Sequence, residues 1–183
     1  EQSAVVINQR WGLTVPISNS YAYAIGGCTV GTSPSGCTSR TNVLQTFQIY
    51  NNDSGAPAGY STSANTYATN PNRIGASSTV YNGRLYLAGG CTSATDCTTA
   101  VDTVSYTTID SATGELGAWT DSSSAGTGSL PALRTWGKLL SAGTSLYYIG
   151  GQDSTATNEQ TSVYWISPDP STGALTTWST ATN

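Results

Sequence analysis

The chain has no histidine and no methionine, and it carries few charged residues. Without histidine, neither a Ser–His–Asp nor a Cys–His nucleophilic centre can form within these 183 residues, and a copper site would lack its imidazole ligands. Only 9% of the residues are Asp, Glu, Lys or Arg, against about 25% in an ordinary soluble domain. The six basic residues are scattered, so we expect no nucleic-acid partner. No apolar run approaches the ~20 residues of a membrane span.

Ser, Thr, Asn and Gly fill the place of the missing charges. Hydrophobic residues make up 37% of the chain, and 11 tyrosines and 5 tryptophans are present. A disordered chain would be rich in charge and poor in aromatics. The composition therefore predicts a folded β protein. Because methionine is absent, we expect Glu1 to begin a processed chain or a fragment.

The four cysteines form two close pairs, Cys28 with Cys37 and Cys91 with Cys97. A metal site would require the two pairs to converge, with shorter C-x₂₋₄-C spacing or with histidines. The gaps here are longer, so two local disulfides are the better interpretation. Disulfides persist in oxidising compartments, which predicts an extracellular or cell-surface protein.

A threefold internal repeat organises the whole chain. Three apolar segments end in a double glycine, with first glycines at Gly26, Gly89 and Gly150, which are 63 and 61 residues apart. An arginine precedes each by 16 residues, and a turn followed by an aromatic residue closes each unit. The arginines are Arg10, Arg73 and Arg134, and the closing aromatics are Tyr60, Trp119 and Trp178. We expect units at residues 1–70, 71–131 and 132–183.

The periodicity inside a unit is that of strands. In the first unit, Val43, Phe47 and Ile49 alternate with polar residues, as in a half-buried strand. Turn signals such as Asn82-Gly83 separate the segments. Each unit is predicted to hold four strands: one led by the arginine, one ending in Gly-Gly, one rich in β-branched residues, and one carrying the closing aromatic.

The arginine-led strand, the Gly-Gly strand and the tail from Thr113-Gly114 to Trp119, followed by Leu130-Pro131 and Arg134, resemble the kelch repeats of bacterial secreted and surface proteins. The resemblance covers the whole chain and implies an all-β fold: three four-stranded antiparallel blades of a partial β-propeller. Two departures stand out: the units are longer than the ~50 residues of kelch repeats, and the first has Tyr60 where a tryptophan is expected. Propellers close with about 4–8 blades. We therefore expect further blades of a longer chain, or a homo-oligomer, to complete the ring.

The loops after Gly-Gly are the expected binding surface. In a four-stranded antiparallel blade, these loops and the blade-to-blade connections emerge on one face, together with both disulfides and the starts of the arginine-led strands. Loops on a rigid scaffold commonly bind partners, although the disulfides alone are also explained as restraints on long loops. The candidate binding residues are Trp11, Trp136, Asp96 and Asp153. We further expect the linkers 61–72 and 121–133 to share this face.

The other recurring residues are predicted to be structural. The three arginines would suit a carboxylate ligand, as in sialidases, which are also propellers. However, a residue repeated in every blade is better explained by hydrogen bonds to the neighbouring blade's carbonyls. Trp119, Trp165 and Trp178 are expected to pack between blades. Asp53, Asp110, Asp153 and Asp169 fall at repeat positions typical of turn formers.

These patterns predict a non-enzymatic extracellular scaffold for adhesion or assembly, which binds protein or glycan through its disulfide-pinned loop face. They offer no catalytic residue, cofactor or metal. Two alternatives remain open. One is a fragment of a carbohydrate-active propeller enzyme whose catalytic residues lie on missing blades. The other is a structural repeat of a surface filament or sheath.

Overall fold

The computed structural model describes residues 9–30, 36–41, 44–49, 57–62, 73–92, 97, 99–122, 127–153 and 158–181, with the backbone alone at 57–62. Within these ranges the protein is all-β and contains no α-helix. No helix in the described part is long and apolar enough to cross a membrane. Asp96 and Asp53 lie outside the described residues.

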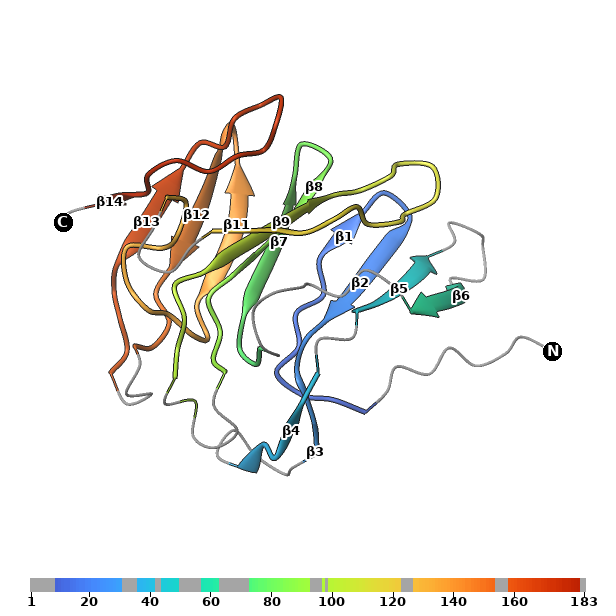
Figure 1. Cartoon of the computed structure of the whole chain (residues 1–183), viewed down its shortest axis with the longest axis horizontal. Helices are drawn as coiled ribbons and strands as arrows, with labels where there is room; N and C mark the ends of the chain where they lie inside the picture. The colour runs from blue at the N-terminus through green and yellow to red at the C-terminus, as the bar shows by residue number, and fades with distance from the viewer. Residues whose placement is uncertain are drawn as a thin grey trace.

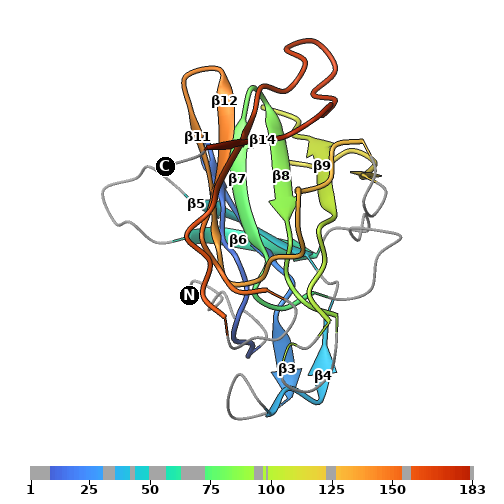
Figure 2. The ribbon, with the colours of Figure 1, turned by 90° about the vertical axis from the view of Figure 1, so that its left-hand side faces the viewer.

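Three four-stranded antiparallel sheets repeat the same strand arrangement (Figure 1). The first has the order β1 (Ile17–Ser18), β2 (Tyr21–Ile25), β5 (Leu44–Ile49) and β6 (Pro57–Thr62). The second contains β7 (Ser77–Tyr81), β8 (Arg84–Ala88), β9 (Val104–Thr108) and β10 (Thr120–Asp121). The third contains β11 (Lys138–Ala142), β12 (Ser145–Ile149), β13 (Val163–Ile166) and β14 (Ser179–Ala181). A separate hairpin, β3 (Cys28–Val30) with β4 (Ser39–Arg40), lies at one end of the molecule in both Figure 1 and Figure 2.

The strand boundaries differ slightly from the prediction that the arginines and the closing aromatic residues lie within strands. Each arginine precedes the first strand of its sheet instead of lying within it, and Trp119 and Trp178 come directly before β10 and β14. The turn at Asn82-Gly83 is a two-residue hairpin with positive φ at both residues, 47° and 68°. That is the conformation for which Asn-Gly is favoured between two strands.

The second sheet is buried on both faces, because its side chains alternate between two neighbours. Leu85 and Leu87 pack toward the first sheet. Tyr86 and Ala88 pack toward the third. The expectation of a half-buried third strand was therefore wrong in detail for β5: four consecutive residues from Leu44 are buried, whereas Ile49 is 37% exposed. Val43 lies outside the described residues.

Hydroxyl groups join the inner strands of neighbouring sheets. Thr14 Oγ1 and Ser78 Oγ lie 2.6 Å apart between the first and second sheets. Leu139 N donates to Ser77 Oγ at 2.8 Å, and Ser141 Oγ donates to Val80 O at 3.0 Å, between the second and third. These neutral hydrogen bonds give the Ser- and Thr-rich composition a structural role at the inner strands.

In the first two units, the repeated arginine donates to carbonyls of its own unit, where the sequence predicted bonds to carbonyls of the neighbouring one. Arg134 instead donates to Ser162 Oγ and to the Tyr164 hydroxyl of its own unit. Arg73 is 1% exposed, and its Nη1 donates to the carbonyls of Gly89 and Thr103 at 3.4 and 3.2 Å. Arg10 Nη1 donates in the same way to Gly26 O at 3.1 Å. In these two units, the constant spacing of 16 residues joins an arginine to the first glycine of Gly-Gly through a hydrogen bond.

Tyrosine–turn contacts connect each sheet to the following one. Tyr23 on β2 donates its hydroxyl to Gly114 O at 3.1 Å, and Tyr86 on β8 donates to Gly173 O, also at 3.1 Å. Both carbonyls lie in the turn that leads to the last strand of the next unit. The two donors occupy the same place in their units, three residues before the first glycine of Gly-Gly.

An aspartate organises each of these two turns, as expected from their positions. Asp110 Oδ1 accepts hydrogen bonds from the backbone N–H groups of Ala112 and Thr113. Asp169 Oδ1 accepts from those of Ser171 and Thr172. The bonds from Thr113 and Thr172 contribute most to holding the pKa of each carboxyl below its usual range. The carboxylate form therefore supports the turn, and this support is lost as the pH falls through the lowered pKa.

We expect alkaline pH to open the tyrosine–turn contacts. Burial raises the pKa of Tyr23 and of Tyr86 to about 12, because the interior disfavours the phenolate. A raised folded-state pKa contributes stability that is complete below the unfolded-state value of about 10 and is lost as the pH rises above it. Denaturant unfolding at a series of pH values should therefore show stability falling between about pH 10 and pH 12. Tyr86→Phe should reduce this slope, and an identical slope in the variant would contradict the assignment.

Candidate binding face

Two disulfides lie directly after the first two double glycines. Cys28 pairs with Cys37, with a Cα–Cα distance of 5.8 Å, and Cys91 pairs with Cys97, at 5.2 Å. These are the pairs that the spacing predicts. All four cysteines are buried, and they form one apolar cluster with Ile74.

Trp11 and Trp136 pack on the same cluster and are partly buried. Trp11 forms a backbone bridge with Cys28, with N–O distances of 3.1 and 2.9 Å. Its indole Nε1 is buried and has no hydrogen-bond partner among the described residues. We call the end of the molecule where Trp11 and Trp136 pack against the two buried disulfides the loop face. Sequence reasoning had placed these elements on one side of the molecule, and the structure brings them into contact.

A backbone ladder runs beneath the loop face from one unit to the next. Gly75 N donates to Gly12 O at 3.0 Å, and Trp136 N donates to Gly75 O at 2.8 Å. The three residues each lie two positions after a repeated arginine, and their φ angles are 66°, 66° and 60°. The third unit therefore places a tryptophan in a left-handed conformation for which the first two units use glycine.

The indole of Trp136 lies against both glycines of this ladder. A Cβ atom on Gly75 would lie 2.8 Å from Cδ2 and Cε2 of the Trp136 ring, and one on Gly12 would lie 3.1 Å from its Cη2. A bulky residue at positive φ costs about 1–2 kcal/mol relative to glycine. Strain of this kind is concentrated at functional sites, where the surrounding structure maintains it.

Asp153 is held by its own loop. Its Oδ2 accepts from Asn158 Nδ2 at 3.3 Å and from Gln160 Nε2 at 3.5 Å. The preceding residue, Gln152, pairs with Thr135 beside Trp136, which keeps this loop next to the loop face. Asp153 therefore shapes the third loop.

The prediction that the other three tryptophans pack between neighbouring units is confirmed for two of them and wrong for the third. Trp178 is buried between the second and third sheets, and Trp119 is partly buried between the first and second, as predicted. Trp165 was expected to pack there too, but it is 41% exposed. Tyr164 and Ile166 take the inward positions of β13, so alternation turns Trp165 outward.

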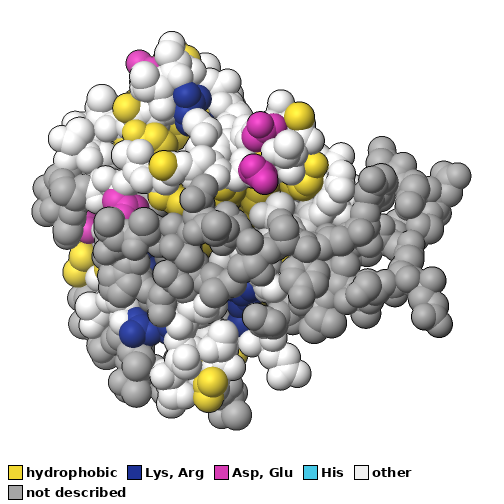
Figure 3. Space-filling model, turned by 45° about the vertical axis from the view of Figure 1, so that its right-hand side comes forward, with side chains coloured by type: hydrophobic (Ala, Val, Ile, Leu, Met, Phe, Trp, Pro, Cys, Tyr) yellow, Lys and Arg dark blue, Asp and Glu magenta, His cyan; other side chains and the backbone are white. Residues whose placement is uncertain are grey.

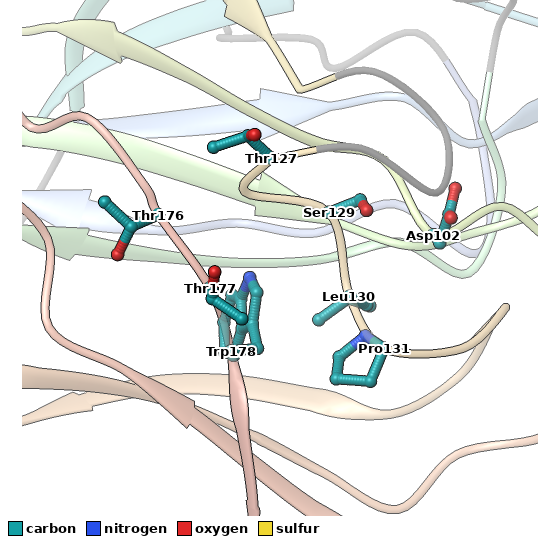
Figure 4. Close-up of a pocket in the computed structure, with 8 residues that line it drawn as sticks. All are labelled: Asp102, Thr127, Ser129, Leu130, Pro131, Thr176, Thr177 and Trp178. Carbon is teal, nitrogen blue, oxygen red and sulfur yellow. The ribbon is translucent and has the colours of Figure 1, made fainter.

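The linker between the second and third sheets reaches the start of β9, where Leu130 N donates to Asp102 O at 2.8 Å. Beside it lies a cavity of about 520 Å³ that the sequence did not predict (Figure 4). Trp178 forms one wall and donates Nε1–H to Gly128 O at 3.0 Å. The remaining lining combines hydroxyls, a buried carboxylate and two apolar residues: Thr127, Ser129, Thr176, Thr177, Asp102, Leu130 and Pro131. The linker segment 63–72 lies outside the described residues.

Charge is sparse where the surface is described. On the face shown in Figure 3, basic side chains lie apart from one another among uncharged ones. No group of three His, Cys, Asp or Glu residues in the described ranges is placed to hold a metal ion.

Together, the sheets and the loop face define an all-β protein built from three repeated antiparallel units. The solved structure of YjhT is similar to this chain, with a TM-score of 0.63 and 14% sequence identity. The alignment covers 94% of this chain and 46% of that chain, so this chain spans less than half of the YjhT length. At this identity the similarity concerns the fold alone. No family model and no curated protein matches the sequence.

Proposed function

We propose that the chain is a non-enzymatic extracellular scaffold, a partial propeller of three kelch-like blades that binds glycan or protein through the loop face. The strongest support is Trp136, a bulky residue at φ 60° where the preceding units have glycine. Two buried disulfides brace the segments beside it.

A neutral glycan fits this face best. An indole presents a flat apolar surface on which a sugar ring can stack, and Trp11 and Trp136 place two indoles on one cluster. The Nε1 of Trp11 is buried, so Trp11 would contribute apolar contact alone. The described surface has few charges, so hydrogen bonding and stacking would dominate recognition. Disulfides in an oxidising compartment agree with a secreted or surface-attached protein.

The test is the substitution Trp136→Gly, which restores the residue type of the first two units. Relief of the backbone strain should offset part of the lost apolar contact, so the free energy of unfolding should change by no more than about 1–2 kcal/mol. Binding to a panel of immobilised neutral oligosaccharides should fall about tenfold or more, as for an aromatic residue at the centre of an interface.

Trp165→Thr is the matched control, because it removes an exposed indole from the far side of the third sheet. It should leave oligosaccharide binding unchanged. Binding that survives Trp136→Gly but is lost in Trp165→Thr would show that the loop face is the wrong surface. If no oligosaccharide binds the unchanged chain, the glycan proposal fails.

A further inference from the structure

Three contacts repeat, in the same register, wherever one unit meets the next. The second glycine of Gly-Gly donates its N–H to the carbonyl of the following arginine: Gly27 to Arg73 at 2.9 Å, and Gly90 to Arg134 at 2.8 Å. The tyrosine–turn contacts form the second set, and the inner backbone ladder forms the third. Each unit thus offers specific groups to the unit that follows it.

The third unit has the same groups, and no unit follows it within the described residues. Gly151 corresponds to Gly27 and Gly90, and the described part of the chain holds no fourth arginine-led segment to accept its N–H. Tyr147 corresponds to Tyr23 and Tyr86, three residues before the first glycine of its unit. Unlike those two tyrosines, which are fully buried, Tyr147 is only partly buried.

An apolar face surrounds Tyr147. Cross-strand pairing places Leu140, Tyr147 and Trp165 in one row across β11, β12 and β13, and Ile149 with Val163 in the next row. Leu140, Ile149 and Trp165 are 39%, 42% and 41% exposed. We call these five residues the outer face of the third sheet.

The equivalent face of the second sheet is an interface within the chain. Tyr86 and Tyr106 form the row that corresponds to Tyr147 and Trp165, and Ala88 with Val104 forms the next. Tyr86, Ala88 and Val104 are fully buried beneath the third sheet. The outer face of the third sheet therefore matches the buried face of the second sheet, both in strand register and in its apolar residues.

We propose that the outer face of the third sheet is the docking surface for a further repeat unit of this type. That unit would carry an Asp-x-x-x-Gly turn whose glycine carbonyl accepts the Tyr147 hydroxyl, and an arginine whose carbonyl accepts the Gly151 N–H. The first sheet of a second copy fits less well, because its outward residues Ala22, Ala24 and Phe47 are already buried. This proposal does not depend on ligand binding at the loop face.

The experiment compares the chain with an extended form in which residues 122–183, which include the linker before Arg134, are repeated after Ala181. Hydrogen exchange at Gly151 and along β12 and β13 should slow by about tenfold or more in the extended chain, because docking removes local opening. Quenching of Trp165 fluorescence by acrylamide, obtained as the difference from Trp165→Phe, should fall. Tyr147→Phe should lower the melting temperature of the extended chain and leave that of the original chain unchanged.

Two controls keep the result decisive. Tyr86→Phe, at the equivalent internal contact, should lower the melting temperature of both forms. A second extended chain, in which residues 63–131 follow Ala181, guards against failure of one appended unit to fold. If neither extension protects Gly151 or shields Trp165, the proposal is overturned. It is also overturned if the original chain dimerises and shields Trp165 by itself, because the occupant would then be a second copy.

Discussion

Replacing Arg73 with alanine is expected to lower the free energy of unfolding by about 3–5 kcal/mol, the usual effect of breaking a buried charged network. The guanidinium is 1% exposed and donates to Gly89 O, Thr103 O and Ser105 Oγ. Truncation leaves the carbonyl of Gly89 and the Ser105 hydroxyl without this donor, whereas Thr103 O keeps the N–H of Gly89. A buried group left unsatisfied costs about 1–3 kcal/mol. Unfolding in urea, followed by tryptophan fluorescence, measures the loss.

Arg10→Ala is the matched control, because Arg10 occupies the same repeat position but is only partly buried. It donates to Gly26 O and to Gln45 Oε1, and water can replace part of these contacts. Its loss should cost about 1–2 kcal/mol. Equal effects at the two positions would contradict the claim that burial, more than the repeat position itself, makes Arg73 important.

Gly89→Ala is expected to destabilise the fold by about 3 kcal/mol or more, through a steric clash combined with backbone strain. Gly89 has φ +65°, and a Cβ atom there would lie 2.4 Å from the carbonyl oxygen of Arg134. That oxygen is backbone and cannot rotate away, and it also accepts the Gly90 N–H of the inter-unit contact. The second and third units would have to separate locally, which urea unfolding would report.

Gly83→Ala separates backbone strain from the clash. Gly83 has nearly the same φ, +68°, but nothing lies within 4 Å of an added Cβ. The expected cost is about 1 kcal/mol, the ordinary preference for glycine at positive φ. If Gly89→Ala is no worse than Gly83→Ala, the close approach of Arg134 to Gly89 does not restrict this position.

The strand architecture could be predicted from the sequence because the chain repeats three times. Gly26, Gly89 and Gly150 and their arginines are separated by a constant 16 residues. In the first two units the spacing reflects a local contact, since the arginine side chain donates to the carbonyl of the first glycine. The all-β class and the cysteine pairs followed from short-range patterns of the same kind.

Several features that depend on two units at once were missed, although the packing of Trp119 and Trp178 between sheets was predicted. The outward direction of Trp165 depends on which face of β13 the second sheet covers, and a strand rich in apolar residues on both faces gives no sign of this. The donor role of Tyr23 and Tyr86 toward turns 91 and 87 residues away was equally hidden. At the loop face, the sequence indicated Trp136 as a candidate binding residue because it is aromatic. Its left-handed backbone conformation belongs to the inter-unit ladder and could be seen only in the structure.

The tyrosine–turn contacts give the array a direction. The turn at 169–173 belongs to the third unit but closes the second, just as the turn at 110–114 closes the first. In a linear array of repeats, stability is the sum of each unit's own term and the terms between nearest neighbours. Here part of the neighbour term is a turn of the later unit that accepts a tyrosine hydroxyl of the earlier unit. Damage to that turn therefore weakens the unit before it as well as its own unit.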